Sequence, residues 1–117
     1  MPKPPAVTTL YHTVSESGLQ ALQTLRWRGL PPCAEAAFYP ALTRQFALET
    51  TRLWKLPEWG TGYLTRFKIS ARYVRDFEVQ SLSGEVYEEL WVPTEELGAF
   101  NQHIVGKIEV LQVLHGS

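Results

Sequence analysis

The stretch that decides the fold reads Glu85-Val86-Tyr87-Glu88-Glu89-Leu90-Trp91-Val92-Pro93. Aliphatic side chains recur at every second position, and aromatic side chains occupy the positions between them. This period of two predicts a β-strand that is covered on both faces. Glu88 and Glu89 therefore point in opposite directions, and Glu89 shares its face with Tyr87 and Trp91.

A carboxylate between two aromatic rings, as predicted for Glu89, is suited to binding a cation. The rings attract a cationic ring or an oxocarbenium-like centre, and the carboxylate supplies a full negative charge. The alternative is that Glu88 and Glu89 are solvated charges at a sheet edge. We take Glu89 as the candidate catalytic residue, with Tyr87 and Trp91 as candidate ligand-binding neighbours.

The composition is that of one soluble globular domain. The chain has 117 residues, of which 44% are hydrophobic and 20% are charged, and its net charge is -1. This length is enough for one core, so we expect a single domain over residues 1–117, with residues 1–6 as a flexible leader. Because a basic excess is missing, we expect neither a nucleic-acid surface nor a membrane surface.

Cysteine and histidine usage narrows the chemistry further. Cys33 is the only cysteine, which excludes an intrachain disulfide and favours a reducing, cytoplasmic location. His12, His103 and His115 are far apart in the sequence, so we expect no metal site. We also find no apolar run that is long enough for a transmembrane helix.

The order of the predicted elements is that of an α+β protein with an antiparallel sheet late in the chain. Helices are predicted from Ser15 to Gly29 and from Thr43 to Pro57, with Ser15 and Thr43 as N-caps. The second helix is expected to turn one apolar face to the core, formed by Phe46, Ala47, Thr50, Leu53 and Trp54. Trp59 follows in a loop, where it either covers the core or contacts a ligand. Further short helical turns are expected over 70–77 and after a Thr94 cap. Strands are predicted over 6–13, 62–69, 78–80, 85–93 and 107–114, with a brief extended segment over 36–40.

Four motifs resemble those of small bacterial proteins labelled as ADP-ribosylation proteins. They are Phe38-Tyr39-Pro40, Gly62-Tyr63-Leu64-Thr65-Arg66-Phe67, Glu88-Glu89-Leu90-Trp91-Val92-Pro93-Thr94-Glu95-Glu96-Leu97 and Phe100-Asn101-Gln102-His103-Ile104-Val105-Gly106. The resemblance runs from about Leu10 to Val110. It implies the ADP-ribosyltransferase fold, which is a split β-sandwich of two small sheets with two flanking helices around a cleft for NAD.

The same resemblance implies a site of His-Tyr-Glu type, formed by His12, Tyr39 and Glu89. His12 is then expected to hydrogen-bond a ribose of NAD, and Tyr39 to stack on the cationic nicotinamide ring. Glu89 is expected to bind the nicotinamide-ribose hydroxyl and to stabilise the oxocarbenium-like state. Tyr87 and Trp91 complete the predicted NAD-binding set.

The resulting hypothesis is an NAD-dependent ADP-ribosyltransferase or an NAD glycohydrolase, with an acceptor that the sequence leaves open. The alternative is a catalytically inactive protein of the same fold that recognises a nucleotide or a protein partner through Trp59 and Trp91. A third hypothesis, RNA processing, requires basic residues that converge on the cleft, and the net charge gives it no support. The candidates for that role are Arg26, Arg28, Arg66 and Arg72.

Overall fold

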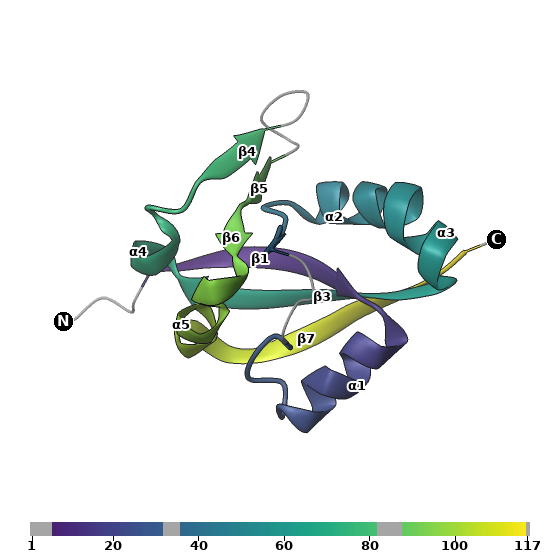
Figure 1. The fold of residues 1–117 in the computed structure, drawn as a ribbon, viewed down its shortest axis with the longest axis horizontal. Helices are drawn as coiled ribbons and strands as arrows, with labels where there is room; N and C mark the ends of the chain where they lie inside the picture. Colours follow the sequence, from purple (N-terminus) through teal and green to yellow (C-terminus); the bar gives the residue numbers. More distant parts are fainter. Residues whose placement is uncertain (1–5, 32–35, 82–87, 117) are drawn as a thin grey trace.

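The computed structural model describes residues 6–31, 36–81 and 88–116. Its centre is an antiparallel sheet in the order β1-β3-β7, formed by β1 (Val7–Val14), β3 (Thr61–Ser70) and β7 (Ile104–His115) (Figure 1). The three predicted strands are confirmed, but β7 begins three residues earlier than expected. Gly106 makes this possible. It lies where the β3–β7 register shifts, and glycine readily adopts the φ of 79° found there.

Helix α1 (Glu16–Thr24) begins at the predicted cap. The Ser15 hydroxyl accepts the Gly18 N–H, which satisfies one of the unpaired donors of the first turn. The helix ends before Gly29, because Arg26 and Trp27 adopt left-handed φ angles of 57° and 64°. The Trp27 carbonyl then accepts the Ile108 N–H at 2.7 Å, so the chain leaves α1 along the edge of β7.

The second helical run is longer than predicted and changes its winding. It comprises α2 (Arg44–Thr50), a π-helical turn η1 (Thr51–Lys55) and α3 (Leu56–Trp59). The Thr43 cap is confirmed, since its hydroxyl accepts the Phe46 N–H at 3.2 Å. The predicted stop at Pro57 is wrong, because Pro57 falls in the first turn of α3, where a missing N–H is tolerated.

The π turn also corrects the predicted apolar face of this run. In η1 the Leu56 N–H bonds to the Thr51 carbonyl five residues earlier, which widens the turn and shifts the following side chains around the helix. Leu53 and Trp54, which we expected to face the core, are 70% and 72% exposed. Only the residues before the widened turn keep the predicted direction, and Phe46 and Ala47 are buried.

The two helical runs cover opposite faces of the central sheet. Leu10 of β1 belongs to the same buried cluster as Leu22 of α1, whereas the next residue, Tyr11, packs with Phe46 of α2. Successive strand residues point to opposite faces, so this alternation divides the helices between them. The prediction of an α+β domain is confirmed.

The remaining strands form two pairs rather than the one second sheet that we expected. They are β2 (Ala37–Phe38) with β6 (Val92–Pro93), and β4 (Val79–Ser81) with β5 (Glu88–Leu90). The predicted strand 85–93 is therefore interrupted at Trp91, and Glu85, Val86 and Tyr87 lie outside the described residues. Pro40 accepts the Leu90 N–H but has no N–H to return, which leaves the ladder incomplete at this point.

Two short helical segments complete the described chain. The Ser70 hydroxyl caps α4 (Ala71–Val74) by accepting the Tyr73 N–H, as the predicted turn over 70–77 requires. The Thr94 cap is wrong, because the 3₁₀ turn η2 (Thr94–Glu96) begins at Thr94 itself and leads into α5 (Leu97–Gln102). None of the described helices has the length and hydropathy needed to cross a membrane.

Phe100 of α5 joins the strand pairs to the central sheet. Its side chain is fully buried, and its ring meets those of Phe38 and Phe67 edge to face, at centroid distances of 5.1 and 6.0 Å. Phe38 belongs to β2 and Phe67 to β3, so one aromatic contact chain connects two layers. Phe38 also forms part of the wall of the cleft described below.

A buried pair of hydroxyl groups attaches η1 to β1, and its loss should be measurable. Thr51 donates to the Ala47 carbonyl at 2.6 Å, so Thr13 must donate to the Thr51 oxygen, 2.7 Å away. We expect Thr51→Val to lower the free energy of unfolding by about 1–3 kcal/mol, because the buried Thr13 hydroxyl loses its acceptor. Urea unfolding measures this loss.

Thr50→Val is the matched control for that substitution, since the Thr50 hydroxyl bonds only to carbonyls of its own helix. The double variant Thr13→Val/Thr51→Val should regain part of the stability, because it removes both hydroxyl groups together. Equal losses in Thr50→Val and Thr51→Val would contradict a special role for the buried pair.

Candidate functional site

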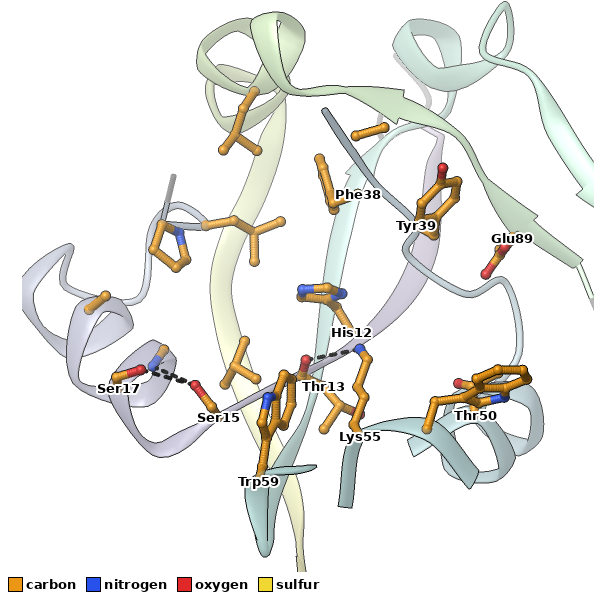
Figure 2. Close-up of a pocket in the computed structure, with 18 of the residues that line it drawn as sticks. His12, Thr13, Ser15, Ser17, Phe38, Tyr39, Thr50, Lys55, Trp59 and Glu89 are labelled. Atoms are coloured by element: carbon orange, nitrogen blue, oxygen red, sulfur yellow. Dashed lines mark hydrogen bonds between the residues drawn. The ribbon is translucent and has the colours of Figure 1, made fainter. Parts of the chain in front are cut away.

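A cleft of about 850 Å³ lies at the β1 edge of the central sheet, between α1 and the α2–η1–α3 run (Figure 2). Its lining includes residues from β1, the first turn of α1, the segment that contains β2, the second helical run and β5. The lining includes the aromatic and ionisable side chains of His12, Tyr39, Trp54, Lys55, Trp59 and Glu89, which can bind a ligand or take part in a reaction. A cleft of this size is typical of small-molecule and cofactor sites.

Ala41 explains why three distant segments meet at this cleft. It exchanges two backbone hydrogen bonds with Tyr11, of 2.9 and 2.8 Å, and on its other side it pairs with Glu89. His12 follows Tyr11, and Tyr39 lies two residues before Ala41. The pairing of Ala41 with Tyr11 on one side and Glu89 on the other therefore brings His12, Tyr39 and Glu89 to one cavity.

His12 presents a neutral imidazole to the cleft. Its backbone carbonyl accepts the Thr65 hydroxyl, and its ring lies edge to face with Phe38 at a centroid distance of 5.7 Å. Burial, helped by the nearby Lys55 ammonium, lowers the pKa of His12 from 6.5 to about 3. Its Nδ1 atom is buried and has no hydrogen-bond partner among the described residues, a situation that is rare in a purely structural histidine.

Glu89 is a half-buried carboxyl group on β5. Burial raises the pKa of Glu89 above its ordinary value, and the positive charge of Lys55 opposes that rise. Glu88 is equally half-buried but is not part of the cleft lining, so the predicted opposition of the two glutamates holds. The acid that the sequence favoured is the one that faces the cavity.

The other predicted ligand-binding residues divide between the cleft and its surroundings. Tyr39 lines the cleft and is 41% exposed, so its ring is available to a ligand. Trp91 is half-buried outside the described cleft lining, although its alternation with Glu89 predicted a shared site. Its backbone N–H bonds to the carbonyl of Glu78, the residue immediately before β4. Tyr87 lies outside the described residues.

Lys55 and Trp54 are site residues that sequence reasoning missed. The Lys55 ammonium donates to the Thr13 carbonyl at 3.2 Å and lies 5.5 Å from the centre of the Trp59 ring. Regular helical spacing placed Trp54 in the core and gave Lys55 no role. Pro57 was the available signal that the helix is irregular here. It has no N–H to bond to the Leu53 carbonyl, as a regular helix would require. Trp59, for which the sequence left two roles open, lines the cleft and is 36% exposed.

The arrangement combines three complementary chemical features. The rings of Tyr39 and Trp59 and the Glu89 carboxyl group suit a cationic or developing-cationic centre. The neutral imidazole of His12 suits an uncharged hydroxyl group, because it carries one donor and one acceptor nitrogen. Lys55 suits an anion. No three His, Cys, Asp or Glu side chains gather as metal ligands within residues 6–31, 36–81 and 88–116.

Fold and site together define a small α+β domain with an aromatic cleft, lined by Glu89 and Lys55, at the edge of its main sheet. No protein-family model matches the chain, and no curated protein matches it in sequence. The function proposed below is therefore argued from the residues of the cleft and from the motifs in the sequence.

Proposed function

We propose that this protein cleaves the nicotinamide glycosidic bond of NAD and transfers the ADP-ribose to water or to an acceptor nucleophile. One observation carries the proposal: His12, Tyr39 and Glu89 line the same cleft although they come from three separate segments. These are the residues to which the resemblance to ADP-ribosyltransferase-type proteins assigns the His-Tyr-Glu site. The volume of the cleft is large enough for a ligand of this class.

Each residue has a role that follows from its chemistry. The exposed Tyr39 ring stacks on the nicotinamide, whose positive charge favours an aromatic face. His12 hydrogen-bonds a ribose hydroxyl and remains uncharged while it does so, because its pKa is about 3. The Glu89 carboxylate accepts a hydrogen bond from the hydroxyl of the nicotinamide ribose and fixes the orientation of that sugar.

The reaction needs no redox step. As the glycosidic bond breaks, nicotinamide leaves with the bonding electron pair and becomes neutral, while positive charge develops on the ribose. The negative charge of Glu89 stabilises that oxocarbenium-like centre. Water or an acceptor then forms a new bond to the anomeric carbon and releases a proton to solvent.

Incubation of the purified protein with NAD tests this function. We expect release of nicotinamide in step with either free ADP-ribose or ADP-ribose attached to protein. Chromatography measures the first two products, and mass spectrometry of the intact protein detects the third. A folded sample that binds NAD without releasing nicotinamide would contradict catalysis.

Binding of NAD without release of nicotinamide would favour the alternative, a protein that recognises a nucleotide without turnover. The specific observation in its favour is the exposure of two indole rings, of Trp54 and Trp59, on the lining of one cleft. Stacking on such rings binds nucleobases without chemistry. Quenching of tryptophan fluorescence by ADP-ribose, without any product, would be its signature.

A further inference from the structure

Lys55 occupies a defined position inside the cleft. It is the only lysine or arginine on the cleft lining in the part of the chain that the structure describes. Its ammonium group is oriented by the Thr13 carbonyl at 3.2 Å and by the face of the Trp59 ring. Its charge helps burial to lower the pKa of His12 and opposes the rise that burial causes in the pKa of Glu89, so Lys55 acts on both groups across the cavity.

The first turn of α1 adds positive potential to the cleft that holds Lys55. Ser15, Ser17 and Gly18 line the same cleft, and they belong to the cap and first turn of the nine-residue helix α1. This end of a helix carries partial positive charge, which adds to that of the ammonium group. In Figure 2, Ser15 and Ser17 stand at one side of the cleft and Glu89 at the other, with Lys55 between them.

Trp54 supplies an aromatic surface beside this cation. The Lys55 ammonium lies 5.5 Å from the centre of the Trp59 ring, and the neighbouring Trp54 also lines the cleft and is 72% exposed. Trp54 and Lys55 are consecutive residues of the π turn η1, and π turns are frequent at functional sites. One widened turn thus presents an indole face and an ammonium group to the same cavity.

We propose that this turn forms a subsite for a nucleoside diphosphate, in which Lys55 binds the phosphates and Trp54 stacks on the base. The choice of ligand rests on the proposed function, because the ADP portion of NAD has this chemistry. Two parts of NAD then bind at different places in the cleft. The diphosphate binds at Lys55, and the glycosidic bond that breaks lies at Glu89. An ammonium group binds phosphate through charge-assisted hydrogen bonds, and an indole ring accepts any base by stacking.

Calorimetric titration of the purified protein with ADP and with adenosine tests the subsite. We expect wild type to bind ADP more tightly than adenosine, with an ADP affinity that falls as salt is added. Lys55→Met keeps the aliphatic stem and should weaken ADP binding by about tenfold without changing adenosine binding. Lys55→Arg should retain ADP binding. Trp54→Ala should weaken both ligands by about tenfold or more.

Lys68→Met is the matched control, because Lys68 is exposed on β3 and lies away from the described cleft lining. It makes the same change in net charge and should leave ADP binding unchanged. The ADP-to-adenosine comparison in wild type needs no variant, so the test survives a Lys55→Met protein that fails to fold. Three results would overturn the subsite: no ADP binding by wild type, equal affinity for ADP and adenosine, or unchanged ADP affinity in Lys55→Met.

Failure of the subsite can be distinguished from failure of the proposed function. Binding of ADP through Lys55, in a protein that releases no nicotinamide, would keep the subsite and overturn NAD cleavage. Nicotinamide release with an unchanged KM for NAD in Lys55→Met would keep NAD cleavage and overturn the subsite.

Discussion

Glu89→Gln is expected to lower the rate of nicotinamide release from NAD by about a hundredfold to a thousandfold. The substitution removes the negative charge that faces the developing positive charge on the ribose, and it keeps the size and one acceptor oxygen of the side chain. Because that charge acts mainly in the transition state, NAD affinity should change little. The loss should therefore appear in kcat rather than in KM.

Glu88→Gln is the control for this prediction. Glu88 neighbours Glu89 on β5 and is half-buried like it, but it is not part of the described cleft lining. Its backbone carbonyl, which accepts the Leu42 N–H, is unaffected by the substitution. Steady-state kinetics of both variants decides the matter. A loss at Glu88 as large as that at Glu89, or an unchanged rate in Glu89→Gln, would exclude the proposed mechanism.

Acidification from pH 7 to pH 5 is expected to destabilise the protein by about 2 kcal/mol through His12 alone. Below pH 6.5 the unfolded chain binds a proton at His12, whereas the folded chain excludes that proton until the pH nears 3. The unfolded state therefore gains about 1.4 kcal/mol for each pH unit below 6.5. Above pH 6.5 both states hold a neutral ring, and this contribution to the pH dependence disappears.

The His12→Asn variant isolates that contribution. Glu89 has the opposite effect, because its raised pKa lets the folded chain take up a proton before the unfolded chain does as the pH falls. The variant keeps Glu89, so the difference between the two proteins reports His12. Urea unfolding at pH 7 and at pH 5 provides the free energies. Equal losses of stability in wild type and His12→Asn would show that His12 is not held neutral by its surroundings.

Local sequence signals predicted most of the elements and one residue of the site. Ser15 and Thr43 are predicted N-caps whose hydroxyl groups bond within three residues, and such caps depend on local spacing alone. The alternation around Glu89 separated it from Glu88, because side chains alternate in any extended strand. The same alternation failed for Trp91, because the ladder is interrupted after Leu90, where Pro40 offers no N–H.

The sequence by itself determined the α+β class, the Ser15 and Thr43 caps, the long strands and the preference for Glu89, since each depends on neighbours within a few residues. Only the tertiary structure decided the rest of the site. Ala41 joins Tyr11 to Glu89 through pairing between distant segments, and that pairing creates the cleft. The neutral state of His12 comes from burial, and the positions of Trp54 and Lys55 come from a π turn. These features depend on contacts between residues far apart in the chain or on a departure from regular helix geometry, so spacing along the sequence does not reveal them.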